Sequence, residues 1–354
     1  MSRPPRRLLA AGLRILLTTG LLATAACGAD SPDGADDVVA AAEAGELVVY
    51  SGRNENLVSP LLEQFTEATG IEVATRYGGS AELAAQLLEE GDRTPASVFL
   101  SQDAGALGAL QDAGRLEPLD PATLDKVPAQ YRSSQGRWVG VSGRSRVLVY
   151  NPDLVGAAAL PTSVFDLTAP QYKGKVAYAP TNASFQSFVT GMRVSAGEER
   201  TKAFLEGFKA NEPRAYDGNV LIVDAVNSGQ IPFGLVNHYY LYEKAAEQGG
   251  LDNLTARNYL FPGDDPGSLV NVAGVAVLAG QQSQDAQTFV DYLLGTQAQT
   301  YFAERTKEFP LIEGVQADVP GLPPLSDLQG PKVDLSQLDS LEQTLQLLDE
   351  VGLT

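Results

Sequence analysis

The sequence predicts an α/β protein of two lobes joined by a hinge, and three features of the chain support this expectation. Between residues 47 and 113, short apolar segments of strand length alternate with segments of helical periodicity, the order that gives a mainly parallel sheet flanked by helices. The roughly 300 residues from Leu47 onward exceed what a single hydrophobic core comfortably holds. The long alternating segment 138–150 is suited to cross between the lobes.

The N-terminal segment predicts export of the protein. Residues 1–26 contain four arginines and no acidic residue, and a largely apolar run ends directly at Cys27. This run is shorter than the about 20 apolar residues of a membrane-spanning helix, so we expect a cleaved signal peptide. The pair Arg6 and Arg7 also admits a twin-arginine export signal, which the surrounding residues support only weakly.

Cys27 is the only cysteine, which excludes an intramolecular disulfide and thiolate metal clusters. The order Thr24-Ala25-Ala26-Cys27-Gly28 resembles the lipobox of bacterial lipoproteins, in which the cysteine is lipidated and becomes the mature N-terminus. The resemblance implies a protein anchored to the outer face of the cytoplasmic membrane; the alternative is an ordinary thiol near a cleavage site. Residues 27–46 lack aromatic side chains and are expected to form a flexible linker.

The charge of the chain limits its partners. Removal of the four signal-peptide arginines changes the net charge from −19 to about −23. So acidic a protein is not expected to bind nucleic acid or anionic membranes.

The first lobe is expected to comprise residues 47–135 together with about 270–320. Its opening strand and helix show the pattern clearly, because Leu57, Leu61, Leu62 and Phe65 recur at helical spacing before Gly70. The expected strands are residues 47–50, 71–77, 98–100 and 270–278, and the expected helices are residues 56–69, 81–90, 104–113, 286–294 and 297–305.

The second lobe is expected to comprise about 136–269 and a C-terminal helix within 321–354. The tail 334–351 carries leucines at helical intervals and is expected to pack on the outside of one lobe. The other expected elements are strands at residues 175–179 and 231–236 and helices at residues 184–195, 201–210 and 239–248.

Ligands of open parallel sheets bind at the carboxyl ends of the strands. We therefore expect ligand-binding residues at five places in the chain: after Tyr50, after Leu100, around Ser142, around Asn182 and after Val236.

These places lie in segments 47–54, 95–99, 138–147, 180–182 and 237–240. Together the segments resemble the periplasmic ferric-ion-binding proteins, the bacterial members of the transferrin-like class of solute-binding proteins. The resemblance spans nearly the whole mature chain. It implies a type II periplasmic-binding-protein fold that binds Fe(3+) between its lobes and delivers it to an ABC transporter permease of the inner membrane. It also implies a monomer without enzymatic activity.

The most specific element of the resemblance is Asn237-His238-Tyr239-Tyr240. Ferric ion is a hard, highly charged cation that prefers anionic oxygen ligands such as phenolates. A tyrosine has an ordinary pKa of about 10, so binding at neutral pH releases phenolic protons. Neighbouring residues of a regular helix point about 100° apart, so both tyrosines reach one ion only from an irregular first turn. The alternative is that these tyrosines, like Tyr242, only pack.

The chain departs from the family at two ligand positions. Asn54 stands where well-known members have a histidine, and Gln102 stands where they have an acidic residue. Both are candidate ligands, with Asp103 or water as further oxygen donors. A subgroup has another tyrosine where this chain has Phe185. The only histidine, His238, is either a ligand or a local hydrogen-bonding residue, and sites built from His and Cys are excluded by count.

The missing charge is expected to come either from a synergistic anion such as phosphate or carbonate, as in relatives, or from water and Asp103. By resemblance, the hydroxyl of Ser142 and the backbone of Gly143 hold this anion with Asn182 and Asn237. Two arginines, Arg53 and Arg144, are expected either to add charge-assisted hydrogen bonds or to form salt bridges at the surface.

Two other functions compete with iron binding. The same fold with a small anionic organic ligand, such as a phosphonate or a phosphorylated metabolite, would use Arg53, Arg144, Ser142 and Asn182. An enzyme is a third class, but the chain has no Gly-x-Ser-x-Gly or phosphate-loop motif and one histidine.

Overall fold

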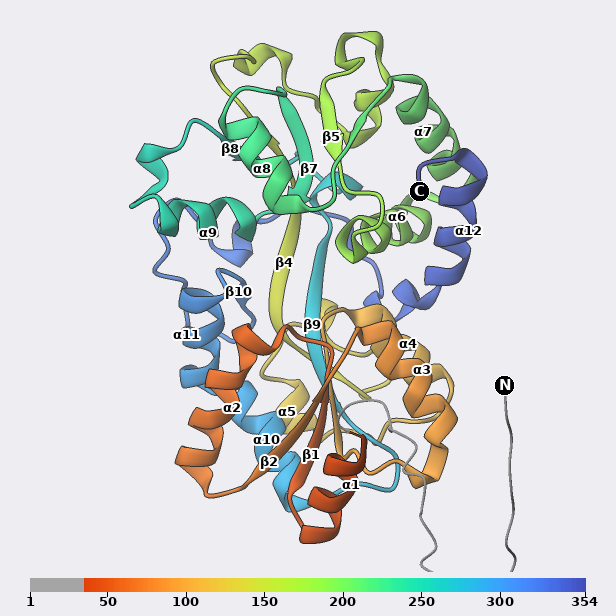
Figure 1. The fold of residues 1–354 in the computed structure, drawn as a ribbon, viewed down its shortest axis with the longest axis vertical. Coiled ribbons are helices and arrows are strands. Elements are labelled where there is room, and N and C mark those ends of the chain that lie inside the picture. The colour runs from red at the N-terminus through yellow and green to blue at the C-terminus, as the bar shows by residue number, and fades with distance from the viewer. Residues whose placement is uncertain (1–34) are drawn as a thin grey trace, which may run out of the picture.

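The computed structural model describes residues 35–354, which form two lobes one above the other (Figure 1). The expected α/β fold with two lobes is confirmed. The predicted signal peptide of residues 1–26 and the lipidation site Cys27 lie outside the described residues. Within the described part of the chain, every helix is too short or too polar to cross a membrane.

The first lobe is a mainly parallel sheet covered by helices on both faces (Figure 1). Strand β1 (Leu47–Ser51) pairs in parallel with β2 (Val73–Tyr77) and β3 (Val98–Ser101), and β9 (Val270–Val277) runs antiparallel to β3. All residues of β1 and β3 are buried, as expected for strands covered on both sides. The helices of this lobe are α2 (Glu55–Thr69), α3 (Ser80–Glu90), α4 (Ala104–Asp112), α5 (Pro121–Leu124), α10 (Gln284–Leu293) and α11 (Thr296–Arg305).

The second lobe repeats this architecture and also has three strands paired in parallel. Strand β5 (Val176–Tyr178) lies between β6 (Arg214–Ala215) and β7 (Phe233–Asn237) and pairs with both in parallel. A short strand, β8 (Arg257–Tyr259), belongs to the same sheet. The helices are α6 (Ala183–Ala196), α7 (Glu198–Ala210), α8 (Asn219–Asn227) and α9 (Tyr239–Glu247).

Strand β4 (Val139–Tyr150) connects the two lobes, as the alternating segment predicts. Its first half pairs with β9 and with β10 (Phe309–Pro310), and its second half pairs with β7 and β8. Figure 1 shows β4 and β9 running side by side through the junction between the lobes. Residues in the middle of this strand therefore lie at the junction between the two lobes.

The predicted flexible linker of residues 27–46 is wrong for its C-terminal part. Residues Ala35–Ala44 form helix α1, which packs against β1 and β2. Val38 is buried, and Ala41 and Ala42 pack against the core of the first lobe. Three small apolar side chains on one face are enough to dock this helix, although the segment has no aromatic residue.

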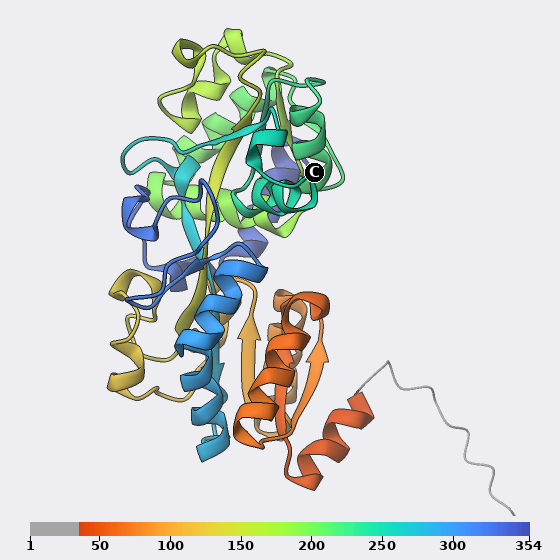
Figure 2. The ribbon, with the colours of Figure 1, turned by 90° about the vertical axis from the view of Figure 1, so that its left-hand side faces the viewer.

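The C-terminal segment contacts both lobes, whereas residues 321–354 were expected to belong to the second lobe alone. Leu335 and Leu338 of the short helix η9 (Leu335–Asp339) are buried in the core of the first lobe. Helix α12 (Leu341–Val351) packs on α6 and α7 of the second lobe. In Figure 2 the blue part of the chain lies on both lobes, and the C-terminus lies on the second.

Two glycines of α4 make the contact with η9 possible. A Cβ at Gly105 would lie 2.3 Å from the carbonyl oxygen of Leu338, and one at Gly108 would lie 2.1 Å from that of Ser336. Any larger residue would push the tail away from the first lobe. The C-terminal tail thus contacts both lobes, and the two glycines of α4 leave the space that its contact with the first lobe requires.

We expect Leu348→Ala to lower the free energy of unfolding by about 2–5 kcal/mol, the usual cost of removing a buried leucine side chain. Leu348 is 1% exposed in the core of the second lobe, whereas Leu345 on the same helix is 40% exposed. Leu345→Ala is therefore the matched control and should change stability by less than about 0.5 kcal/mol. Urea unfolding of both variants measures the difference. Equal losses would show that α12 is not docked through this face.

Candidate functional site

A cavity of about 210 Å³ lies between the two lobes, where the predicted site residues converge. Its walls come from the ends of β3 and β7, the starts of α6 and α9, and the middle of β4. The lining residues are Gln102, Asp103, Arg144, Arg146, Asn182, Ala183, Ser184, Ser187, Phe188, Asn237, Tyr239, Tyr240, Leu269 and Asn271. Of the ten predicted metal and anion contacts, six line this cavity: Gln102, Arg144, Asn182, Asn237, Tyr239 and Tyr240.

The two adjacent tyrosines stand side by side at the start of α9. Their ring centroids are 4.3 Å apart, with the planes inclined by 34°. The strand β7 ends at Asn237 and α9 begins at Tyr239, so a single residue, His238, makes the turn between them. This abrupt junction brings both rings to one side, as a shared ligand requires. The N-terminal end of the helix also favours negative charge on the phenols.

Burial raises the pKa of the Tyr239 phenol well above its ordinary value, and the neighbouring Tyr240 adds to the rise. The guanidinium of Arg144 acts in the opposite direction. Tyr239 is therefore protonated at neutral pH, and a cation that bound the phenolate would have to displace this proton.

Arg146 is a cavity residue that the sequence analysis missed. It lies two positions after Arg144, and alternate residues of a strand share one face. Its Nη1 donates hydrogen bonds to Asn237 Oδ1 at 3.1 Å and to Ser184 Oγ at 3.2 Å. The guanidinium carbon lies 5.3 Å from the centre of the Phe188 ring. Burial lowers the pKa of Arg146 to about 10, so the side chain is still charged at neutral pH.

Two nitrogens of Arg146 are left over. The side chain is 4% exposed, and among the described residues Nε and Nη2 find no hydrogen-bond acceptor. No carboxylate of residues 35–354 forms a salt bridge with this guanidinium. A buried cation without an anionic partner is costly, because its lost hydration is not replaced. An anion in the cavity would relieve that cost.

Asn182 belongs to a polar cluster at the start of α6. Its Oδ1 accepts hydrogen bonds from the backbone N–H of Ser184 at 3.0 Å and from Ser184 Oγ at 2.7 Å. The Nδ2 of Asn219 donates to the same oxygen at 3.1 Å. The cluster fixes the rim of the second lobe and places Ser184 against Arg146.

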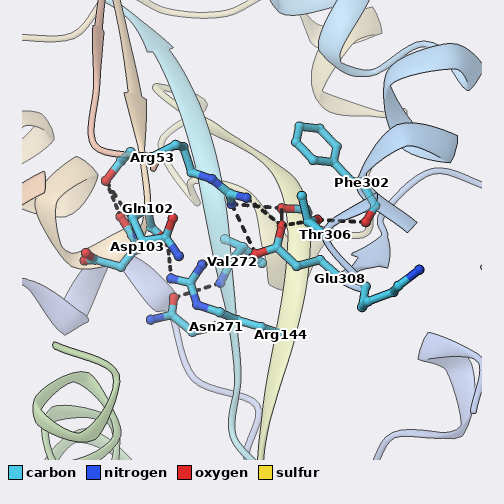
Figure 3. Close-up of polar contacts among 12 residues, drawn as sticks. Arg53, Gln102, Asp103, Arg144, Asn271, Val272, Phe302, Thr306 and Glu308 are labelled. Atoms are coloured by element: carbon cyan, nitrogen blue, oxygen red, sulfur yellow. Dashed lines mark hydrogen bonds and ion pairs between the residues drawn. The ribbon is translucent and has the colours of Figure 1, made fainter. Parts of the chain in front are cut away.

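Three predicted anion contacts, Arg53, Ser142 and Gly143, do not line the cavity. Arg53 forms a two-pronged ion pair with Glu308, with 2.8 Å between Nη2 and Oε2 and 3.2 Å between Nη1 and Oε1 (Figure 3). The hydroxyl of Ser142 donates to Glu308 Oε2 at 2.8 Å. Gly143 lies in β4 opposite Phe309 of β10. Arg53 therefore forms a salt bridge, but a buried one rather than the surface salt bridge that the sequence left as an alternative.

Arg144 lies between this ion pair and the cavity. Its Nη1 is 3.7 Å from Glu308 Oε1, and its Nη2 donates to the backbone carbonyl of Gln102 at the end of β3 (Figure 3). Arg144 therefore joins the first lobe, the connecting strand and the cavity.

Of the candidate oxygen ligands, Gln102 and Asp103 line the cavity and Asn54 does not. Asn54 is exposed and caps α2, because its Oδ1 accepts from the backbone N–H of Asn56 at 3.0 Å. Asp103 lines the cavity but caps α4 through hydrogen bonds from Gly105 at 3.0 Å and Ala106 at 3.2 Å. No group of three or more His, Cys, Asp or Glu side chains suited to a metal occurs within residues 35–354.

His238 is a structural residue beside the tyrosines. Its Nδ1 accepts a hydrogen bond from the backbone N–H of Ser145 at 3.2 Å, so Nε2 carries the proton and donates to the carbonyl of Lys307 at 2.9 Å. With both ring nitrogens occupied, the hydrogen-bonding interpretation fits and ligation does not. Burial lowers the pKa of His238 to about 4.

We expect His238 to make the protein less stable as the pH falls from about 6.5 toward about 4. Its folded pKa is about 4, below the ordinary 6.5, so in this range the unfolded chain binds a proton that the folded chain does not. The full loss below the lower value is about 3 kcal/mol. Urea unfolding between pH 7 and pH 4.5 should show a shallower decline for His238→Phe than for the unchanged protein. Parallel declines would contradict the assignment.

The chain is similar to proteins that bind solutes outside the cytoplasm. The family described as bacterial extracellular solute-binding protein matches residues 93–334. The Fe(3+)-binding periplasmic protein of Serratia marcescens is 41% identical over 309 residues, which cover 87% of this chain and 90% of the relative.

Solved structures show the same likeness. Iron-bound HitA from Pseudomonas aeruginosa superposes with a TM-score of 0.78 at 35% identity, over 87% of this chain and 99% of the other. The Trichodesmium protein IdiA (FutA), in complex with iron and citrate ligands, superposes with a TM-score of 0.75 at 30% identity, over 88% and 100%.

Proposed function

The chain belongs to the family of bacterial extracellular solute-binding proteins, and from this premise we propose that it binds ferric iron between its lobes for import. The tyrosine pair at the start of α9 carries the proposal, because two phenols side by side at a helix N-terminus suit a hard trivalent cation. The family consists of solute-binding proteins of transport, so the chain is not an enzyme.

The charge of the cavity supports an anion beside the iron. Two phenolates would neutralise two of the three charges of Fe(3+). The cavity is lined by two guanidinium groups, Arg144 and Arg146, and by one carboxylate, Asp103, which caps α4; among the described residues no carboxylate pairs with Arg146. Phosphate or carbonate would restore the balance. The unsatisfied Nε and Nη2 of Arg146 favour a position near that side chain, with Asn182 and Asn237 close by. Ser142 and Gly143, which lie outside the cavity, are less suited.

A small anionic organic ligand is the second candidate. The same two buried guanidinium groups and the exposed position of Asn54, which removes one ligand from the iron shell, favour it. In this case the phenols would act as neutral hydrogen-bond donors.

Titration with ferric citrate, with and without phosphate, separates the two candidates. Iron held by phenolates gives a saturable visible charge-transfer band. An organic anion raises the melting temperature through preferential binding to the folded state without any colour. If the protein stays colourless, and organic phosphates raise its melting temperature while ferric citrate does not, the cargo is an organic anion and not iron.

Delivery to an ABC transporter permease and anchoring through a lipid on Cys27 complete the proposed role, with the protein acting as a monomer at the outer face of the cytoplasmic membrane. The sequence around Cys27 supports the anchor. A Cys27→Ser variant that remains in the membrane fraction after expression would contradict it.

A further inference from the structure

A short turn between α11 and β10 is held in a strained conformation. Residues Thr306, Lys307 and Glu308, here called the 306–308 strap, include a lysine with φ of 57°. Residues other than glycine seldom adopt this left-handed conformation, which costs on the order of 1 kcal/mol and persists only where the surroundings impose it. The strap must therefore be fixed by contacts on both of its sides.

The first contact is the carboxylate of Glu308. It is 2% exposed and accepts hydrogen bonds from Arg53, Ser142 and Thr306, the last at 2.9 Å (Figure 3). Arg53 lies two residues after the end of β1, in the first loop of the first lobe. Arg144, on the cavity wall, lies on the other side of the same carboxylate. Glu308 thus ties a loop of the first lobe to a side chain of the site.

The second contact is the backbone of Lys307. Its carbonyl oxygen accepts the hydrogen bond from His238 Nε2 at 2.9 Å. The ring of Phe309, directly after the strap, stacks on the imidazole with centroids 4.3 Å apart. His238 is followed at once by Tyr239, so this contact holds the junction from which the tyrosine pair projects.

We propose that the 306–308 strap positions the tyrosine pair and Arg144 together and so couples the first loop of the first lobe to the first turn of α9. Glu308 and His238 are positioning residues in this arrangement, and neither touches the cargo. A rigid, strained turn with one end on each lobe transmits a displacement from Arg53 to Tyr239. Coupling of this kind is reciprocal: loosening either end loosens the other.

Hydrogen exchange of the iron-free protein tests the coupling. We expect Glu308→Gln to speed amide exchange at residues 237–241 by about tenfold, although the Glu308 carboxylate is hydrogen-bonded to Arg53, Ser142 and Thr306 and to none of these amides. Conversely, His238→Phe, which keeps a ring to stack on Phe309, should speed exchange at residues 52–56. Glu304→Gln, at an exposed carboxylate near the end of α11, is the matched control and should change neither segment. Changes confined to the neighbourhood of each substitution would overturn the proposal.

Iron release gives a second readout, which rests on the proposed function. Glu308→Gln and His238→Phe should each shift the maximum of the charge-transfer band and speed iron loss to a competing chelator by at least about tenfold. The double variant should lose iron no faster than the worse single variant, because the two side chains act through one strap. Additive rates would contradict the shared strap. If the unchanged protein shows no band, the proposed cargo fails, and the exchange experiment still decides the strap.

Discussion

Replacement of both Tyr239 and Tyr240 by phenylalanine should abolish the visible band expected of the iron-loaded protein and lower iron affinity by more than about 100-fold. The loss of an outer-shell partner alone typically costs 10- to 100-fold in metal affinity, and these substitutions remove two direct anionic ligands. Phenylalanine retains the ring, so the contact between the two rings at 4.3 Å persists and the fold should be preserved. Visible absorption titration with ferric citrate and a melting curve of each variant make the measurement.

Tyr242→Phe provides the matched control for this double variant. Tyr242 lies on the same helix but is buried outside the cavity, and its hydroxyl donates to the carbonyl of Gly321 at 2.8 Å. Removing that hydroxyl should lower stability by about 1 kcal/mol and leave the band unchanged. A band that survives the double substitution and disappears in Tyr242→Phe would show that iron binds to the face of α9 that carries Tyr242, and the proposed site would be wrong.

The acidity of the medium should weaken iron binding through the same side chains. Burial raises the pKa of Tyr239, so cation binding must expel its proton, and a lower pH favours the protonated phenol. This dependence has the same sign as the effect of His238 on stability but a different origin. The tyrosine effect disappears in the double phenylalanine variant, whereas the His238 effect remains.

Much of the fold was predictable because local patterns are strong where a chain is buried on both sides. The strand of residues 47–50 and the helix of residues 56–69 follow from continuous apolar residues and from helical spacing, and the structure places β1 and α2 there. The connecting strand was predictable from its length. Helix α1 was not, because its docking depends on Val38 meeting a sheet that the local sequence does not reveal.

The site was predictable where the functional group and its element are adjacent in the chain. Tyr239 and Tyr240 follow a buried strand directly, so their position at a strand end could be inferred. The ion pair of Arg53 could not be inferred, because its partner Glu308 lies 255 residues away in the sequence. The positive charge of Arg53 suggested an anion contact, but the ion pair with Glu308 occupies the guanidinium instead. The 306–308 strap could not be predicted for the same reason, because its contacts join residues far apart in the sequence and no local motif marks them.

Arg146→Met should separate binding from stability, since the two effects are expected to differ. The buried guanidinium has two unsatisfied nitrogens, so a well-packed apolar replacement relieves a desolvation cost while losing two hydrogen bonds. We expect the iron-free variant to unfold within about 1 kcal/mol of the unchanged protein. Iron affinity in phosphate, in contrast, should fall by roughly 10- to 100-fold, because charge-assisted hydrogen bonds contribute about 1.5–3 kcal/mol.

The matched control is Arg214→Met, an exposed arginine of the second lobe that should alter neither quantity. Titration with ferric citrate at several phosphate concentrations, together with urea unfolding of the iron-free protein, gives both numbers. A structural guanidinium would behave in the opposite way, since its removal would lower stability and leave the phosphate dependence intact. Loss of the phosphate dependence at unchanged stability would identify Arg146 as the anion receptor of the cavity.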